Sequence, residues 1–138
     1  MKKFIFQKEP IEQEKVLAQI GTDNDGAIVS FIGQARKLSK DKEVKYLEYE
    51  IYESMAGKEL EKIINSAYQN WSLNSCIVIH RYGKVNIGEA SILIALSSPH
   101  REEAYKASRY IIDTIKKTVP IWKKEFYTDN SSWISDRS

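Results

Sequence analysis

The segment TIKKTVPIWKKEF, residues 114–126, places a pair of lysines on either side of a proline. Lys116 precedes Pro120 and Lys123 follows it, and the apolar residues between them are typical of packed structure. An unbroken helix would stack both lysines on one face, but proline interrupts a helix, so they can converge only across a corner. If they do converge, mutual repulsion and partial burial lower the pKa of one amine, which can then act as a base or nucleophile. The alternative is structural, because lysines at a helix end are favoured by the helix dipole and often extend over aromatic neighbours.

Two other segments could bind an anion. In SSPHRE, Ser98 is the expected N-cap of a helix and Pro99 its first residue. The unpaired N–H groups at such a helix start, beside His100 and Arg101, suit a phosphate or carboxylate, although an ordinary cap with solvated side chains fits equally well. Arg36 follows an apolar strand directly, in a position where loops often carry function.

The segment IHRYG places His80 and Arg81 at the end of another expected strand. Both a substrate contact and a structural or interface role fit this pair. Cys76, in the apolar run CIVIH, is expected to be a buried small hydrophobe and not a catalytic thiol. The sequence has no metal-ligand spacing and no phosphate-binding glycine-rich loop, so neither a metal nor a nucleotide cofactor is expected.

Length and composition indicate one domain spanning residues 1–138. The net charge of +2 comes from 21 basic and 19 acidic residues that are mixed along the chain, which argues against a general nucleic-acid binder. A single cysteine excludes an internal disulfide and fits a reducing cytoplasm. The apolar runs are too short for a secretory signal or a membrane span, so a soluble cytoplasmic protein is expected.

Hydrophobic periodicity predicts interleaved strands and helices. The expected strands are residues 2–7, 26–35, 44–52, 75–83, 90–98 and 121–127. The expected helices begin at Pro10, near Ala56 and at Pro99, and the last of them ends before Pro120. This order predicts an α+β domain built around a mixed sheet.

Three local patterns add detail to this outline. The strand at 26–35 is nearly continuously apolar, which predicts that both of its faces are covered, with a bulge or close contact at Gly33. Residues 36–43 are expected to form a loop, and residues 84–89 a simple connection. The last helix is expected to bury a stripe that consists of Ala104, Ile111, Ile115 and Val119.

Four segments occur together and in order: FIGQAR, LEYEIYESMA, IHRYGKVNIGEASILIALSSPHREEAY and IDTIKKTVPIWKKE. They strongly resemble the large, catalytic subunit of molybdopterin synthase, from about Gly26 to Trp133. PHR and the lysine-flanked VPIWK are the most specific matches. The resemblance implies an α/β hammerhead-type fold with additional antiparallel strands.

The resemblance also implies a sulfurtransferase reaction in molybdenum cofactor biosynthesis. Enzymes of this family convert a cyclic pyranopterin monophosphate into molybdopterin by installing the two dithiolene sulfurs. The sulfur arrives as a thiocarboxylate at the C-terminal Gly-Gly of a small ubiquitin-like partner, whose tail inserts into a pocket of the large subunit. Two large subunits form the central dimer of a heterotetramer, and no metal or other cofactor is required.

Carried over by position, the resemblance implies that Lys116 and Lys123 perform chemistry and that Arg36, His100 and Arg101 bind the anionic substrate. A phosphate and a thiocarboxylate require fixed positive charge. Carbon–sulfur bond formation and acyl release require proton transfer, which amines can supply. Lys116 is expected to be the acid/base or transient nucleophile, with Lys123 as its electrostatic partner.

The remaining lysines of the segment, Lys117 and Lys124, are expected to face solvent or an acidic surface of the partner. The sequence departs from the family at the loop KLSKDKE, which lacks the usual glycine, and after Trp133, where the tail is short and Arg137 could replace a basic residue. Two other functions remain open: a non-catalytic module that binds a ubiquitin-like protein, and a small basic RNA-binding domain, which the mixed charge pattern disfavours.

Overall fold

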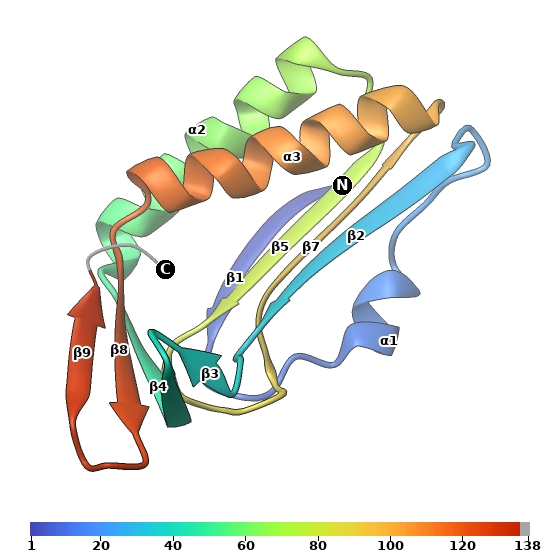
Figure 1. Ribbon diagram of the computed structural model, residues 1–138. Helices are drawn as coiled ribbons and strands as arrows, with labels where there is room; N and C mark the ends of the chain where they lie inside the picture. The colour runs from blue at the N-terminus through green and yellow to red at the C-terminus, as the bar shows by residue number, and fades with distance from the viewer. Residues whose placement is uncertain (136–138) are drawn as a thin grey trace.

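The structure is a computed structural model, and it describes residues 1–135 (Figure 1). Arg137 lies outside the described residues. The helices are α1 (Gln13–Leu17), α2 (Glu53–Asn70) and α3 (Arg101–Thr118). The strands are β1 (Lys2–Gln7), β2 (Ala27–Gln34), β3 (Leu38–Ser39), β4 (Lys42–Ile51), β5 (Ser75–Arg81), β6 (Gly83–Asn86), β7 (Ala90–Ser98), β8 (Ile121–Tyr127) and β9 (Ser132–Ser135).

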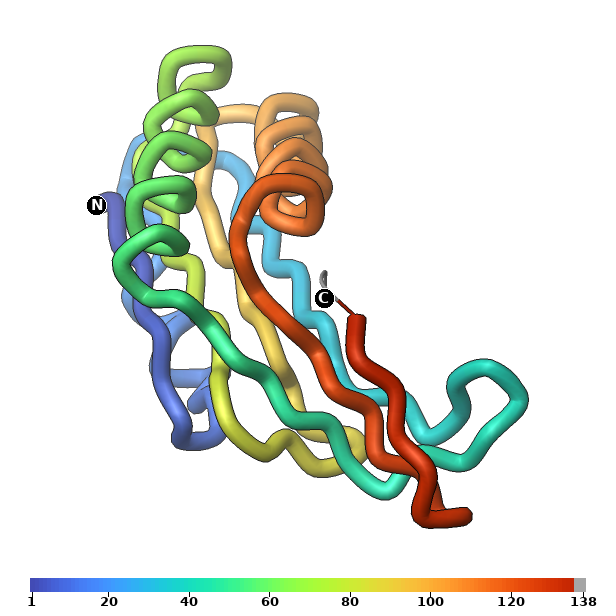
Figure 2. The backbone as a smooth tube through the Cα atoms, turned by 90° about the vertical axis from the view of Figure 1, so that its left-hand side faces the viewer, coloured from blue at the N-terminus to red at the C-terminus, as the bar shows by residue number. Residues whose placement is uncertain are grey.

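The strands form two sheets. The first has the order β1-β5-β7-β2, with β1 parallel to β5 and the other pairs antiparallel. The second is antiparallel, in the order β3-β4-β8-β9 with β6 also paired to β4. Helices α2 and α3 lie side by side over one face of the first sheet, whereas α1 lies on the other face (Figures 1 and 2). The predicted α+β class, with a mixed sheet and additional antiparallel strands, is confirmed.

The core is centred on β5 and β7, in which every residue is buried. Side chains alternate between sheet faces along a strand, so each of these strands contributes to two clusters. In β7, Ile92, Ile94 and Leu96 belong to the larger cluster beneath α2 and α3. Leu93 and Ala95 belong to a smaller cluster beneath α1. Helices on both faces therefore explain the continuous apolar sequence of the two central strands.

Residues 27–34 form the expected strand, but the expectation that both of its faces are covered is wrong. Strand β2 lies at the edge of the first sheet, and its residues are exposed or half-buried, with Ile28 54% exposed. The expected irregularity at Gly33 is confirmed. The register of β2 against β7 shifts between Gly33 and Gln34, and a Cβ atom at Gly33 would lie 2.8 Å from Cγ2 of Ile92.

Residues 36–43 and 84–89 contain strands and not only the expected loops. Strand β3 and the start of β4 form a hairpin whose turn residues, Lys40 and Asp41, have φ angles of 53° and 62°. Positive φ at both positions is typical of a type I′ turn, which usually contains glycine or asparagine. Strand β6 pairs with the central part of β4. Because these short strands are stabilised by pairing with β4, their local sequence gives little periodicity to detect.

Two helices begin later than expected. Helix α1 begins at Gln13 and not at Pro10, because the side-chain amide of Gln7 donates to the carbonyl oxygens of Glu9 and Pro10, at 3.0 and 3.3 Å, and closes a turn there.

Helix α3 begins at Arg101 and not at Pro99, with His100 as its N-cap. Ser98 is not the cap because it is still paired with Ala27 as the last residue of β7. Its hydroxyl oxygen instead accepts a hydrogen bond from the backbone N–H of His100, at 3.4 Å.

Replacement of Leu60 by alanine tests the core beneath α2. Leu60 is 2% exposed, so Leu60→Ala should lower the free energy of unfolding by about 2–5 kcal/mol through lost burial and a residual cavity. On the same helix Met55 is 63% exposed, and Met55→Ala should change stability by no more than about 0.5 kcal/mol. Urea denaturation of the two variants measures both values, and equal losses would contradict the packing described.

Candidate active site

The corner between α3 and β8 brings the two lysines together. Helix α3 ends at Thr118, and Val119 already has an extended conformation, with φ −82° and ψ 127°. Pro120 prevents the helix from continuing, as expected, and β8 begins at Ile121. Lys116 in the last helical turn and Lys123 in β8 consequently line the same cavity of about 240 Å³. The predicted convergence across the corner is therefore present.

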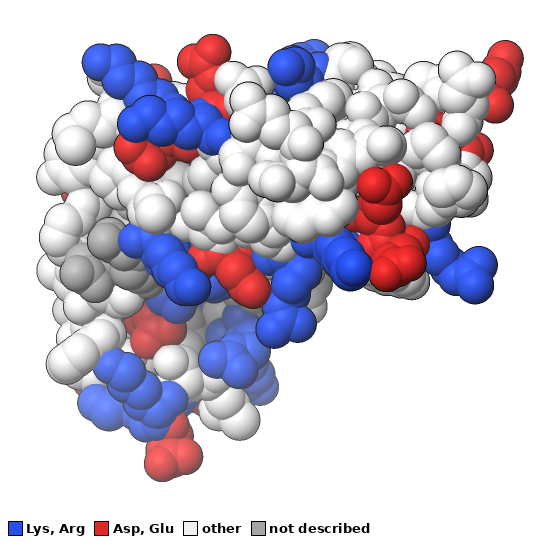
Figure 3. All heavy atoms as spheres, turned by 90° about the horizontal axis from the view of Figure 1, so that it is seen from above, with Lys and Arg blue, Asp and Glu red and all other residues white. Residues whose placement is uncertain are grey.

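This cavity, called the lysine cavity below, lies between α3 and the two sheets. Arg36, which directly follows β2 and Ala35, also lines it and adds a third basic group. Side chains of Lys and Arg also gather on the neighbouring lobe that contains the β3–β4 hairpin (Figure 3). Three basic groups therefore line one cavity, although the chain as a whole carries a net charge of only +2.

Glu125 is a cavity residue that the sequence analysis did not select. It is 7% exposed, and its carboxylate accepts hydrogen bonds from Ser39 at 2.9 Å and from the hydroxyl of Tyr127 at 2.7 Å. Burial opposes ionisation of Glu125, but these hydrogen bonds and the charge of Lys123 lower its pKa. The amine of Lys123 lies 3.8 Å from the carboxylate. The sequence does contain a signal for Glu125. Residues two apart in a strand share a face, so Glu125 is expected on the same face of β8 as Lys123.

Lys116 has a different environment from Lys123. Its side chain is exposed as a whole, yet it lines the lysine cavity. Partial burial lowers the pKa of its amine, and the charges of Lys123 and Arg36 lower it further. Lys116 thus gives up its proton at a lower pH than a solvated lysine does, which is the property a general acid/base requires.

Of the pair His80 and Arg81, only His80 lines the cavity, and Arg81 has a structural role. The imidazole of His80 lines the lysine cavity and packs edge-on against Tyr49, with ring centroids 5.1 Å apart. The Arg81 side chain is 5% exposed and forms an ion pair with Glu89 at 3.2 Å. Its guanidinium also donates to the backbone carbonyl oxygens of Lys8 and Lys84. Arg81 therefore connects the ends of several strands.

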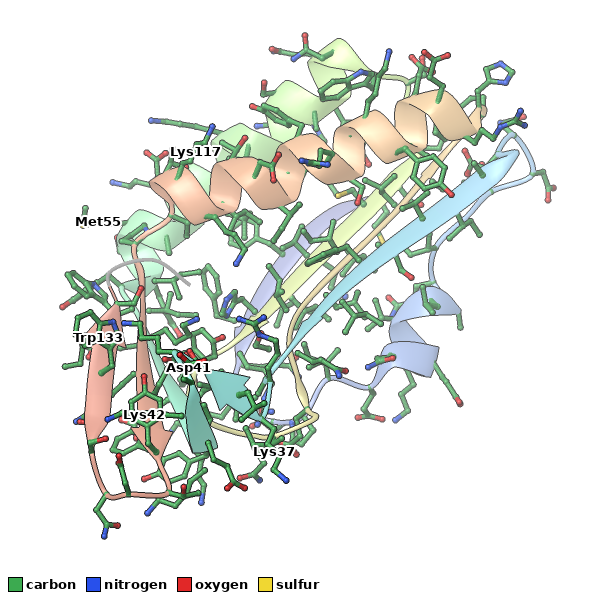
Figure 4. All side chains as sticks on the ribbon, in the orientation of Figure 1. Lys37, Asp41, Lys42, Met55, Lys117 and Trp133 are labelled. Carbon is green, nitrogen blue, oxygen red and sulfur yellow. The ribbon has the colours of Figure 1, made fainter. Side chains whose placement is uncertain are left out.

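The β3–β4 hairpin is attached to β8 and β9 beside the cavity. Besides the bond from Ser39 to Glu125, the amine of Lys40 lies 3.2 Å from the ring centroid of Trp133 on β9. Figure 4 shows Trp133 and the turn residue Asp41 in this region. Although the turn contains no glycine, these two contacts hold the hairpin beside the cavity.

His100 and Arg101 do not line the lysine cavity of their own chain. Both are exposed at the opposite end of α3. The rise of an α-helix separates Arg101 from Lys116 by about 22 Å. Within one chain, the structure therefore brings together three of the five expected site residues and leaves these two apart.

Lys117 and Lys124 lie outside the cavity, as expected. Lys117 is exposed on the side of α3 that faces away from the β3–β4 hairpin (Figure 4). Lys124 points to the other face of β8, where its amine lies 4.8 Å from the ring centroid of Phe126.

Cys76 is fully buried, and burial raises the pKa of its thiol to about 12, so its expected role as a small hydrophobe is confirmed. Within residues 1–135, no group of three or more His, Cys, Asp or Glu side chains is placed to hold a metal ion. No helix in that part of the chain is long and apolar enough to cross a membrane.

Comparison with known proteins identifies the family. Residues 6–118 match the family model described as MoaE protein. The chain is 42% identical to the molybdopterin synthase catalytic subunit of Bacillus subtilis over 137 residues, which are 99% of this chain and 87% of that protein.

Two solved structures are also similar. The crystal structure of molybdopterin synthase from Staphylococcus aureus superposes with a TM-score of 0.88 at 39% identity and covers 94% of both chains. A protein–protein complex of subunits 1 and 2 of molybdopterin-converting factor from Helicobacter pylori matches with a TM-score of 0.71 at 25% identity, over 95% of this chain and 87% of that one. From the family match, the sequence identities and the shared fold, the chain belongs to the MoaE protein family.

Proposed function

We propose that this chain is the catalytic subunit of a molybdopterin synthase. It transfers sulfur from the C-terminal thiocarboxylate of a small ubiquitin-like partner to cyclic pyranopterin monophosphate, which gives the dithiolene of molybdopterin. The observation that carries the assignment to the lysine cavity is the convergence of Lys116, Lys123 and Arg36. Both reactants are anionic, so a cavity with three basic groups and one internally satisfied carboxylate suits them.

The two lysines have different roles in this proposal. Lys123 is adjacent to a carboxylate and acts as a fixed positive charge for the thiocarboxylate or phosphate. Lys116 has the lowered pKa and exchanges protons as the carbon–sulfur bond forms and as water releases the partner's acyl group. Arg36 binds an anionic group of the substrate through its planar guanidinium.

His100 and Arg101 complete the substrate site from a second copy of the chain. Their separation from Lys116 prevents all three from contacting one small substrate within a single chain. A symmetric dimer would place the α3 start of one subunit beside the lysine cavity of the other, twice over. This arrangement is the proposed central dimer of a heterotetramer.

The proposed partner is a small subunit that ends in Gly-Gly. The complex of two subunits known for the related Helicobacter pylori protein supports such an association. The proposed location is the cytoplasm, where the buried thiol of Cys76 stays reduced. Nucleic acid and membranes have no part in the proposal.

The electrostatic coupling between the lysines predicts a shift in the titration of Lys116. Lys123→Gln removes a neighbouring positive charge, so the pKa of Lys116 should rise. Labelling of Lys116 by an amine-reactive reagent, followed by mass spectrometry across a pH series, reports the midpoint. Lys117→Gln is the matched control and should leave this midpoint unchanged. An unchanged midpoint in Lys123→Gln would show that the two amines are not coupled.

Alanine substitutions test the assignment of the cavity to catalysis. Lys116→Ala and Lys123→Ala should each lower the rate of molybdopterin formation by at least about 100-fold, because each removes a charge or proton carrier. Lys117→Ala, one residue away on the exposed side of α3, should retain nearly full activity. The assay combines purified chain, thiocarboxylated partner and pterin monophosphate, with circular dichroism as the folding control. Equal losses in all three variants would refute the site, and binding without dithiolene product in the unsubstituted chain would indicate a binding module only.

Mixing two inactive variants tests whether the site spans two chains. After subunit exchange between Lys116→Ala and Arg101→Ala, half of the dimers are mixed, and each mixed dimer has one site in which both residues are intact. Activity should therefore recover to about one quarter of the wild-type value. If the mixture is no more active than the mean of the separate variants, both residues do not serve one site across the dimer.

A further inference from the structure

We propose that His80 is a positioning residue of the lysine cavity, and that its Nε2 atom accepts a hydrogen bond from an N–H group of the bound reactant. This inference rests on the proposed function. The N–H group belongs either to the pterin ring or to a peptide bond of the partner's Gly-Gly tail. Both are neutral donors, so the recognition chemistry is the same.

The tautomer of His80 follows from its hydrogen bond to the backbone. Its Nδ1 lies 2.7 Å from the carbonyl oxygen of Arg81. A carbonyl oxygen can only accept a hydrogen bond, so in the neutral ring Nδ1 carries the proton. The other ring nitrogen, Nε2, therefore has a lone pair and acts as an acceptor.

The imidazole of His80 lines the lysine cavity, and its Nε2 atom is the ring nitrogen left for an occupant. Every fully buried side-chain nitrogen and oxygen in the described part of the chain has a hydrogen-bond partner. Among the described residues none donates to Nε2 of His80, although the residue is only 3% exposed. Because the ring lines the cavity, Nε2 is open to whatever occupies it.

The position of the imidazole is fixed from two sides. The carbonyl that holds Nδ1 belongs to Arg81, whose side chain is anchored by Lys8, Lys84 and Glu89. The ring of Tyr49 packs against the imidazole at an interplanar angle of 75°. An acceptor held in this way selects the orientation of a bound donor at little entropic cost.

The charge state of His80 makes it distinct from the other cavity groups. Burial lowers its pKa to about 4, an effect that the Arg81 carbonyl opposes and Lys116 reinforces. Near neutral pH the cavity therefore contains the basic groups Lys116, Lys123 and Arg36, the carboxylate of Glu125, and a neutral imidazole. Since Glu125 already accepts bonds from Ser39 and Tyr127, His80 supplies a neutral acceptor that a donor N–H can use.

Two substitutions separate this role from a structural one. The side chain of His80→Asn reaches the position of Nδ1 and can still donate to the Arg81 carbonyl, but it leaves no acceptor at the position of Nε2. The longer side chain of His80→Gln reaches the Nε2 position and can present its amide oxygen there. His80→Gln loses the bond to the Arg81 carbonyl and should therefore unfold at the lower temperature of the two variants. A purely structural role would then predict the weaker binding in His80→Gln, whereas the proposed role predicts it in His80→Asn.

Isothermal titration of the full chain with three probes tests the proposal. Inorganic phosphate reports the basic groups, cyclic pyranopterin monophosphate adds the pterin ring, and the small partner supplies the Gly-Gly tail. His80→Asn should weaken binding of either the pterin or the partner by about tenfold, which identifies the source of the N–H group. The affinity of His80→Asn for phosphate should not change, and its steady-state kinetics should show a raised KM with little change in kcat. In His80→Gln most of the lost affinity should be restored.

Three results would overturn the proposal. Unchanged affinity of His80→Asn for both pterin and partner would mean that only water contacts Nε2. Equal weakening in His80→Asn and His80→Gln, with a lower unfolding temperature and weaker phosphate binding, would indicate a purely structural role. If the unsubstituted chain bound neither pterin nor partner, the proposed function itself would fail, and the role of His80 with it.

Discussion

The site depends on one constraint, the placement of two ammonium groups around one cavity by a corner that cannot relax. Two positive charges that line one small cavity repel each other, and in solution their side chains would move apart. Here Lys116 belongs to a helix whose apolar stripe is buried, and Lys123 belongs to a strand paired on both sides. Pro120 between them prevents the helix from extending. The packing of the core therefore holds the two amines against their repulsion. Partial burial lowers the pKa of Lys116, and the charges of Lys123 and Arg36 lower it further.

The two lysines line one cavity but have different charged neighbours. Glu125 lies on the same face of β8 as Lys123 and partly neutralises it. Ser39, Tyr127 and the β3–β4 hairpin hold that carboxylate in place. Lys116 lines the same cavity, and partial burial together with the charges of Lys123 and Arg36 lowers the pKa of its amine. In the proposed mechanism one amine remains a fixed charge while the other exchanges protons.

The single chain contains an incomplete version of the site that the family resemblance implies. Arg36 joins the lysines, whereas His100 and Arg101 lie at the far end of α3. A helix keeps its two ends apart by its length, so no local rearrangement can bring them together. The proposed dimer would resolve this separation by placing the start of α3 of one subunit beside the lysine cavity of the other. Assembly would then be a condition for substrate binding.

Several features could be predicted from the sequence because they have local causes. The amphipathic patterns of α2 and α3, the apolar runs of β5 and β7, the end of α3 before Pro120 and the bulge at Gly33 all follow from side-chain periodicity or from the restricted backbones of proline and glycine. The basic residues of the cavity were also selected, with the help of the family resemblance. Alternation along β8 would have added Glu125.

Only the tertiary structure decided the features that depend on distant partners. Strands β3 and β6 exist because they pair with β4, and β2 is half exposed because it lies at a sheet edge. Distant partners also give the neighbours His80 and Arg81 different roles. His80 lines the cavity, whereas Arg81 forms an ion pair with Glu89 and anchors strand ends. Sequence thus determined the helices and the longer strands, and it indicated which residues could do chemistry. The fold determined which of those residues meet, because side chains on different elements come together only when both elements pack on the same core.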